Sequence, residues 1–373
     1  MQRSRRWLRR ALIPVALLSS ATLVLAACGG NGASPGGDSS GSAGGSDKPV
    51  AVTLITKTAT NPFFIAMQQG AEQAGKDNNV TVTTVAGKAD GDEQTQIDAI
   101  EAAIARGDNG ILITPATDGV VPKIQEARDA GLYVIALDTP PNPASAVDIT
   151  FATDNFKAGE LIGKWAAGTL AGSDANIALL DLFNDKIASV DYNRDQGFLT
   201  GMGIDVKDKK KNGDEAPSGK YTGGKGGNYT IVCNEPTQGA TDGGKTAMET
   251  CLAKSKNINL VYTINEPAAV GASGALNDAG VKATIVSVDG GCDPGIKAVK
   301  DGTIGATSQQ YPLKMAQLGV EAIAKNARTG EKPTVTPGLD FYDTGVQLVT
   351  DKPVDGVQSI TTAEAEKICW GAK

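Results

Sequence analysis

The chain has 373 residues, with 35 Lys and Arg against 42 Asp and Glu, and therefore a formal net charge of −7. An acidic protein repels phosphates, so the composition argues against a nucleic-acid partner. The sequence contains no His, which removes the commonest general base and the commonest metal ligand. The lack of His therefore argues against many classes of enzyme.

The first residues have the composition of an export signal. Five Arg and no acidic residue precede an apolar stretch from Ala11 to Ala26, which is too short and too interrupted for a spanning helix. The stretch ends in Leu25-Ala-Ala-Cys28, which resembles the bacterial lipoprotein box. We expect residues 1–27 to be a signal peptide and Cys28 to carry lipid, so the mature charge becomes −7 − 5 = −12. An ordinary cleaved signal with an incidental Cys is the alternative.

The next segment, residues 28–49, is almost entirely Gly, Ser, Asn, Ala and Asp. It has nothing to bury, and this composition is typical of a flexible linker. We therefore expect an exported protein that a lipid anchor holds on the outer face of the cytoplasmic membrane. The remaining chain is long enough for two domains of ordinary size.

From residue 50 onward, short runs rich in β-branched residues alternate with helix-length segments. The runs are apolar nearly throughout, as strands covered on both faces are. The predicted strands are 50–56, 80–86, 110–114, 133–137, 149–152, 175–181, 229–234, 259–264, 284–288 and 305–308. Apolar stripes predict helices over 62–77 and 92–106. This rhythm predicts parallel sheets with right-handed crossovers, and it has too many units for one ordinary open sheet.

The segment 207–227 interrupts the rhythm with Lys and Gly and has no apolar period. We expect a surface loop there, with the basic run 207–211 as a solvated face rather than a binding patch.

A phosphate-loop pattern, GxxxxGK[ST], spans Gly239 to Thr246 between a predicted strand and a helix. Export to a compartment poor in ATP opposes nucleotide binding, as does Asp242, which would lie among the phosphates. We interpret the segment instead as a Gly-rich turn before a helix that Thr241 or Asp242 caps.

Four cysteines follow Cys28, and an even number in an exported chain indicates two disulfides. Four cysteines allow three pairings. We favour Cys233 with Cys251, which closes a short strand-to-helix loop, and Cys292 with Cys369, which ties the tail to the loop after Asp289. Free buried thiols and a four-Cys metal site are the alternatives, and the absence of any CxxC pair counts against metal.

Polar and aromatic residues gather where predicted strands end, which is the edge at which open α/β sheets bind ligands. The positions are Asn61, Phe63, Phe64, Asp138, Thr153, Asn265 and Asp289. Amides and carboxylates bind hydroxyl groups, and aromatic faces cover the C–H faces of a sugar ring. Each has a structural alternative, because Asn and Asp also cap helices and the two Phe could belong to the core. Their coincidence at equivalent strand ends favours a sugar site.

The sequence resembles the ribose-type periplasmic sugar-binding proteins of ABC transporters over residues 50–350. The matching stretches are TNPFF (60–64), ILITPATD (111–118), VIALD (134–138), FATDN (151–155), NRDQGF (193–198), INEPAAVGA (264–272) and VSVDGG (286–291). Within this family it looks most like the fructose-type receptors, through FYDTGVQLVTDKPVDG (341–356) and CWG (369–371).

The resemblance implies roles for individual residues. Asn61 and Asp289 resemble hydroxyl-binding residues, Phe63 and Phe64 a ring-stacking pair, and further polar contacts fall to Asp138, Arg194, Asn265 and Gln310. The ribose receptors have an Arg where this chain has Thr139, and an Asn where it has Pro115. Both departures count against ribose. With two carboxylates facing one Arg, the inferred cleft favours a neutral sugar.

The family fold is a type I periplasmic binding protein: two doubly wound α/β lobes of parallel sheet joined by a three-crossing hinge. We place the crossings near Thr153, near Gln310 and within 338–341. One lobe then holds 50–153 and 311–339, and the other 154–310 and 340–373.

These expectations describe a monomeric solute-binding lipoprotein that hands a monosaccharide to an ABC permease and needs neither cofactor nor metal. Fructose ranks first, and ribose or another pentose or hexose second. A sugar-sensing partner of a chemoreceptor or sensor kinase uses the same fold and is the main alternative. A sugar-responsive repressor would need a DNA-binding helix-turn-helix, and a hydrolase would need catalytic groups that this sequence does not offer.

Overall fold

The computed structural model describes residues 49–371. The expected signal peptide, the lipid-accepting Cys28 and nearly all of the linker lie outside the described residues. Within the described part, no helix has the length and apolar character that crossing a membrane requires.

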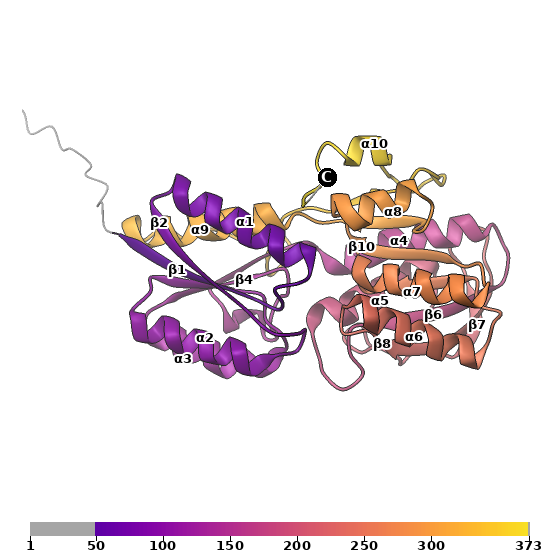
Figure 1. Ribbon diagram of the computed structural model, residues 1–373, viewed down its shortest axis with the longest axis horizontal. Helices are drawn as coiled ribbons and strands as arrows, with labels where there is room; N and C mark the ends of the chain where they lie inside the picture. The colour runs from indigo at the N-terminus through magenta and orange to yellow at the C-terminus, as the bar shows by residue number, and fades with distance from the viewer. Residues whose placement is uncertain (1–48, 372–373) are drawn as a thin grey trace, which may run out of the picture. The chain divides into compact units, whose positions relative to one another are not determined.

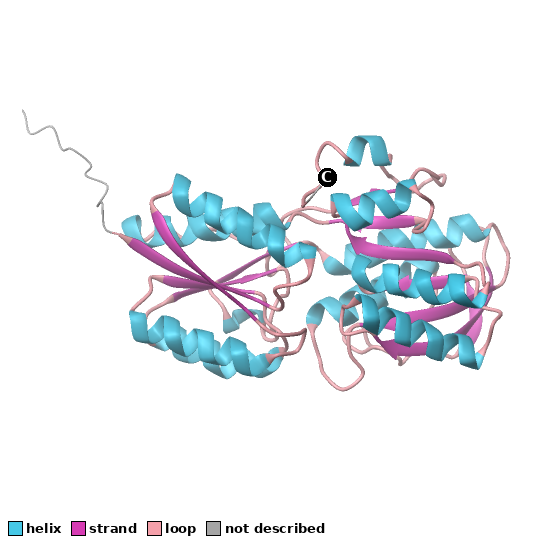
Figure 2. Cartoon of the chain, viewed as in Figure 1, coloured by secondary structure: helices cyan, strands magenta, loops and turns pink. Residues whose placement is uncertain are grey.

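The described chain alternates strands and helices (Figures 1 and 2). The strands are β1 (Val50–Thr56), β2 (Val80–Ala86), β3 (Gly110–Ile113), β4 (Tyr133–Leu137), β5 (Ile149–Ala152), β6 (Ala175–Asp181), β7 (Ser218–Tyr221), β8 (Gly227–Pro236), β9 (Leu260–Thr263), β10 (Thr284–Asp289), β11 (Ala306–Gln309), β12 (Tyr342–Asp343) and β13 (Gln347–Val349). The helices are α1 (Pro62–Asp77), α2 (Glu93–Arg106), α3 (Val121–Asp129), α4 (Asn155–Leu170), α5 (Ser189–Met202), α6 (Thr241–Lys254), α7 (Glu266–Ala279), α8 (Lys297–Lys300), α9 (Pro312–Thr329) and α10 (Thr362–Ala365).

The first sheet has the strand order β12-β5-β4-β3-β1-β2, with every described pair parallel. Helices α1 and α9 cover one face, and α2 and α3 cover the other (Figure 1). Successive side chains of a strand point to opposite faces, so Leu112 packs under α9 while Ile111 and Ile113 pack under α2 and α3. Because the central strands β3 and β4 are buried on both faces, they read as continuous apolar runs.

The second sheet repeats this plan in the order β13-β11-β10-β9-β6-β8-β7. Helices α4 and α5 cover one face, and α6 and α7 cover the other (Figure 1). The edge strands β7 and β13 run antiparallel to their neighbours. The expected surface loop at 207–227 is therefore partly wrong: residues 218–221 form β7, whose Tyr221 is buried in the core.

The two sheets confirm the predicted fold class of two doubly wound α/β lobes. All ten predicted strands are present, with ends shifted by at most two residues. The chain crosses between the sheets after β5, after β11 and after β12. The third crossing differs from the expected 338–341, because Tyr342 and Asp343 pair with β5 in the first sheet. It lies at residues 344–346.

Two disulfides are present, in the favoured pairing. Cys233–Cys251 joins β8 to α6, and Cys292–Cys369 joins the turn after β10 to the C-terminal tail. Both have Cα–Cα distances in the ordinary disulfide range, 5.5 and 5.1 Å.

Candidate functional site

A cavity lies between the carboxyl ends of the two sheets, with walls from both lobes. Its lining is Lys57, Asn61, Phe63, Phe64, Asp90 and Asp138 from the first lobe, and Leu182, Val190, Arg194, Ile264, Asn265 and Asp289 from the second. A wider pocket that shares Asn61 and Asp90 with this cavity opens beside it. This is where a doubly wound fold binds ligands, at the crevice outside the strand ends.

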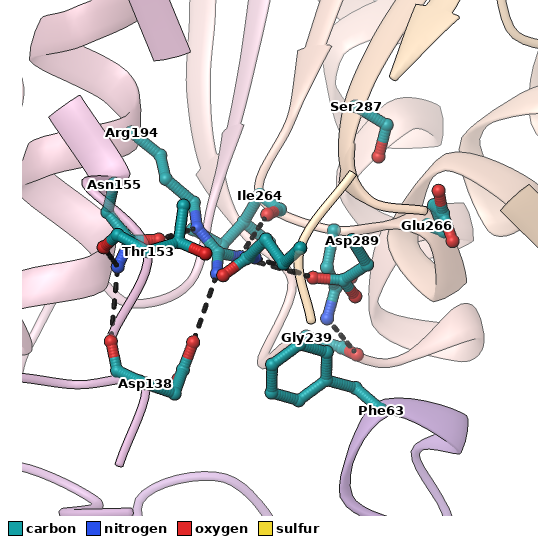
Figure 3. Close-up of polar contacts among 12 residues, drawn as sticks. Phe63, Asp138, Thr153, Asn155, Arg194, Gly239, Ile264, Glu266, Ser287 and Asp289 are labelled. Atoms are coloured by element: carbon teal, nitrogen blue, oxygen red, sulfur yellow. Dashed lines mark hydrogen bonds and ion pairs between the residues drawn. The ribbon is translucent and has the colours of Figure 1, made fainter. Parts of the chain in front are cut away.

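Arg194 of α5 is the centre of the cleft (Figure 3). It is buried, and it donates from Nε to Asn155 Oδ1 at 2.8 Å and from Nη1 to the carbonyl oxygen of Ile264 at 2.9 Å. Its guanidinium also lies 3.5 Å from an oxygen of Asp138 and 3.6 Å from one of Asp289. One cation therefore links carboxylates from both lobes.

The position of Arg194 depends on close contact between α4 and α5. A Cβ added at Gly159 would lie 2.1 Å from the carbonyl oxygen of Arg194, and one at Gly197 would lie 2.2 Å from that of Phe156. Gly163 faces the carbonyl oxygen of Phe198 in the same way. Only glycine permits this backbone approach, so the spacing of glycines on both helices sets the depth of Arg194 in the cleft.

Asp138 follows β4 and adopts a left-handed backbone conformation with φ of 63°. Its Oδ2 accepts a hydrogen bond from Thr139 Oγ1 at 2.8 Å and lies 3.9 Å from Lys57 Nζ. Lys57 is only 3% exposed. Asp138 thus lies between a lysine of its own lobe and Arg194 of the other.

Asp289 ends β10 with φ of 133°, a strained conformation for a residue with a side chain. Gln310 Nε2 donates to its Oδ1 at 3.3 Å. Burial raises the pKa of Asp289 well above its usual value, although Arg194 opposes the rise. Behind it, the Glu266 carboxylate accepts hydrogen bonds from the N–H groups of Gly290 and Gly291, at 2.7 and 3.2 Å. These bonds hold the turn after Asp289.

The aromatic wall comes from the first turn of α1. Asn61 caps that helix by accepting a hydrogen bond from the Phe63 N–H at 2.9 Å. Phe63 and Phe64 meet edge to face, with ring centroids 5.4 Å apart. Phe63 also meets the edge of Trp370, whose indole N–H donates to the carbonyl oxygen of Gln310 at 2.9 Å. Asn61 is therefore both a helix cap and part of the cavity wall.

The segment with the phosphate-loop pattern forms part of the wall of the wider pocket and does not form a phosphate-binding loop. Asn265 Nδ2 donates to the carbonyl oxygen of Gly239 at 3.0 Å, while Lys245 pairs with Asp278 at 2.9 Å on the surface. The expected cap was wrong: α6 begins at Thr241 with Ala240 at the cap position and without a side-chain cap.

The structure brings most of the predicted site residues together. Thr139, Thr153 and Gln310 are not in the cavity lining. Thr139 Oγ1 donates to Asp138, and Gln310 Nε2 donates to Asp289. Thr153 Oγ1 donates to the carbonyl oxygen of Gly345 at 3.0 Å, at the third crossing.

Sequence reasoning missed Lys57 and Asp90 in the lining, and Trp370 behind Phe63. Lys57 directly follows β1, so the strand-end argument that found Asp138 could have found it. Asp90 lies in the loop between β2 and α2, whose path no periodicity indicates.

These additions change the expected charge of the cleft. Three carboxylates, those of Asp90, Asp138 and Asp289, face two cations, Lys57 and Arg194. Burial raises the pKa of Asp90 to about 6, while Lys57 opposes the rise. The cleft therefore has no excess of positive charge to attract an anion, and it offers several acceptors for hydroxyl groups.

Comparison with known proteins places this geometry in a family. Residues 52–332 match the periplasmic binding protein domain. The ribose import binding protein of Bacillus subtilis is 26% identical over 279 residues, covering 74% of this chain and 82% of the relative. The galactofuranose-binding protein of Escherichia coli is 30% identical over 256 residues, covering 66% and 73%.

Among solved structures, an ABC transporter solute-binding protein from Agrobacterium vitis with bound D-fucose is similar. It has 27% identity and a TM-score of 0.67, and the match covers 82% of this chain and 97% of that protein. These relatives are binding proteins, not enzymes. The chain belongs to the periplasmic binding protein family, among its ribose-type sugar-binding members.

Proposed function

We propose that this protein captures a neutral monosaccharide in the cleft and delivers it to the permease of an ABC importer. Fructose is the first candidate, and another hexose or a pentose the second. The names of the relatives support a sugar, because they include binding proteins for ribose and galactofuranose. The observation that carries the proposal is the central Arg194, which links carboxylates of both lobes beside an aromatic wall.

The proposed contacts follow from the chemistry of the lining. Asp138 and Asp289 accept hydrogen bonds from sugar hydroxyls, and Arg194 donates to them or to the ring oxygen. Asn61 and Asn265 offer amide groups to the remaining hydroxyls. Phe63 and Phe64 cover the C–H face of the ring. Thr139 stands in place of a long five-donor Arg, which leaves room for a ring larger than that of ribose.

Capture requires the lobes to move. We propose that residues 50–153 with 311–343, and residues 154–310 with 344–371, turn about the three crossings. Sugar contacts from both walls are complete only when the cleft is closed, so binding favours the closed state.

Calorimetry on the purified protein tests the site. A panel of pentoses, hexoses and polyols should include one neutral sugar that binds, with fructose the first expected. Asp289→Ala should weaken that sugar about ten- to a hundredfold, because a hydrogen bond to a charged group contributes roughly 1.5 to 3 kcal/mol. Asp278→Ala, on the exposed face of α7, is the matched control and should bind normally. Unchanged affinity in Asp289→Ala, or a phosphorylated or amino-acid ligand binding best, would overturn the proposal.

We also propose that the protein is a monomer held at the outer face of the cytoplasmic membrane by lipid on Cys28. The sequence Leu25-Ala-Ala-Cys28 supports the anchor. Cell fractionation of Cys28→Ala tests it: the variant should leave the membrane fraction, and a variant that stays as membrane-bound as the parent contradicts the anchor.

A further inference from the structure

Two charged residues of the first lobe line the cleft cavity and have no part in the sugar contacts proposed above: Lys57 and Asp90. Lys57 is 3% exposed, and its ammonium group donates no hydrogen bond to any residue in 49–371. Asp138 Oδ2, its ion-pair partner, lies 3.9 Å from Nζ, which is too long for a hydrogen bond. A buried ammonium group has three donors to satisfy, so Lys57 has donors left for a molecule in the cavity.

The carboxylate of Asp90 is also without a partner. The ion pairs of the cleft do not include it, and it accepts no hydrogen bond from residues 49–371. A Cβ added at Gly239 would lie 3.0 Å from Asp90 Oδ2 and 3.0 Å from Asn265 Nδ2. Asp90 therefore reaches across the cleft to the second lobe, where Gly239 leaves room because it has no side chain.

The ends of β1 and β2 bring the two residues to the same wall of the cavity. Thr56 pairs with Ala86 in the parallel sheet, and the N–H of Gly87 donates to the carbonyl oxygen of Thr56 at 3.0 Å. Lys57 directly follows the first of these strands, and Asp90 lies in the loop that follows the second. Two groups of opposite charge thus line one cavity without forming an ion pair with each other.

The loop that carries Asp90 is fixed on both sides of that residue. The Lys88 N–H donates to Asp92 Oδ2 at 2.9 Å, and Asp92 is the N-cap of α2. From the second lobe, Lys186 Nζ donates to the carbonyl oxygen of Gly91 at 2.9 Å. The position of Asp90 in the cavity wall is therefore set by its neighbours in the chain.

We propose that Lys57 and Asp90 hold one hydroxyl group of the sugar between them, and so select sugars that carry a free hydroxyl at that carbon. The hydroxyl oxygen accepts a hydrogen bond from Lys57, and the O–H donates to the Asp90 carboxylate. An anion placed there would meet the charge of Asp90, and a cation would meet that of Lys57. A neutral group that both accepts and donates satisfies the two residues together. The assignment rests on the proposed capture of a neutral sugar.

Calorimetry with deoxy sugars tests the pair. D-Fructose, or the neutral sugar of the panel that binds most tightly if fructose does not bind, is titrated first, and then the series of its monodeoxy analogues. In the parent, loss of the hydroxyl that the pair holds should weaken binding about ten- to a hundredfold, because hydrogen bonds to charged groups are lost. In Lys57→Met and in Asp90→Ala the sugar itself should bind more weakly. The penalty for the same deoxy analogue should fall several-fold in both variants, as expected for groups in direct contact.

Lys76→Met and Glu72→Gln, which change exposed residues of α1, are the matched controls and should keep the parental penalty. A merely structural role of Lys57, through its ion pair with Asp138, would weaken the sugar and every deoxy analogue by the same factor. That result would overturn the assignment, as would penalties that fall at different carbons in the two variants, or parental discrimination in Asp90→Ala.

Asp90 is only half-buried, so Asp90→Ala decides the question alone if Lys57→Met fails to fold. If no neutral sugar of the panel binds the parent, the proposed function itself fails, and the assignment fails with it. A sugar that binds the parent without this coupling removes the assignment alone.

Discussion

Replacing Arg194 by Met should destabilise the protein more than any surface substitution in either lobe. The side chain is 5% exposed and lies 3.5 and 3.6 Å from the oxygens of Asp138 and Asp289. Its removal leaves Asp138 with Lys57 at 3.9 Å, and leaves Asp289 with no contacting cation from residues 49–371. Removing one partner of a buried ion pair costs about 3 to 5 kcal/mol, because the other charge stays buried.

The loss of folding stability in Arg194→Met should depend on pH. The folded-state pKa of Asp289 is already raised by burial, and loss of the Arg194 charge raises it further. A carboxyl group with a raised folded-state pKa binds a proton more tightly when folded, so stability rises as the pH falls through that pKa. The deficit of Arg194→Met should therefore be largest near pH 8 and smaller near pH 5.

Urea unfolding followed by circular dichroism, at both pH values, measures the free energy of unfolding. Lys245→Met, which breaks an exposed ion pair with Asp278, is the control and should unfold like the parent. Parental stability in Arg194→Met, or a deficit that is equal at both pH values, would refute the reasoning.

Three further predictions concern packing, pH and the tail. Gly159→Ala places a methyl group against the carbonyl oxygen of Arg194 and should lower the free energy of unfolding by about 1 to 3 kcal/mol and weaken sugar binding, as urea unfolding and calorimetry would measure. Asp90→Asn removes a carboxyl whose folded-state pKa is raised to about 6, so melting scans should show its advantage in Tm over the parent growing as the pH rises from 4 to 7. Replacing both Cys292 and Cys369 by Ala should lower the free energy of unfolding by about 2 to 4 kcal/mol, and an unchanged urea midpoint would contradict this.

The sheets could be predicted because a strand that is buried on both faces appears in the sequence as an unbroken apolar run. Strands such as β3 and β4 are apolar along their whole length, so their limits can be read from the sequence. The strands β12 and β13 have two and three residues, which is too short to show a hydrophobic pattern in the sequence. β7 pairs only at an edge and lies in a Gly-rich segment, where composition indicates a loop.

The cleft was predictable where a strand end or a family motif marks a residue, as for Asp138 and Arg194. Residues that reach the cleft by tertiary packing alone left no such mark. Asp90 is brought there by the path of a loop. Trp370 lies outside the cavity lining, behind Phe63, where a disulfide-bonded tail places it, and the motif CWG marks the residue but not this position. The buried carboxylates at Asp181 and Asp195 look like ordinary surface acids in the sequence, because burial of a charged residue depends on segments far along the chain.

The tail of the chain carries an intrinsic fluorophore, Trp370. Cys369 is bonded to the second lobe, and the next residue, Trp370, has its ring centroid 5.5 Å from that of Phe63 in the first lobe. The emission of an indole depends on its surroundings, so any movement of Phe63 against the tail changes the fluorescence of Trp370. Trp165 is enclosed in the core of the second lobe and supplies a constant background. The proposed opening and closing of the cleft is therefore expected to change the fluorescence of the unlabelled protein, which stopped-flow measurements would follow.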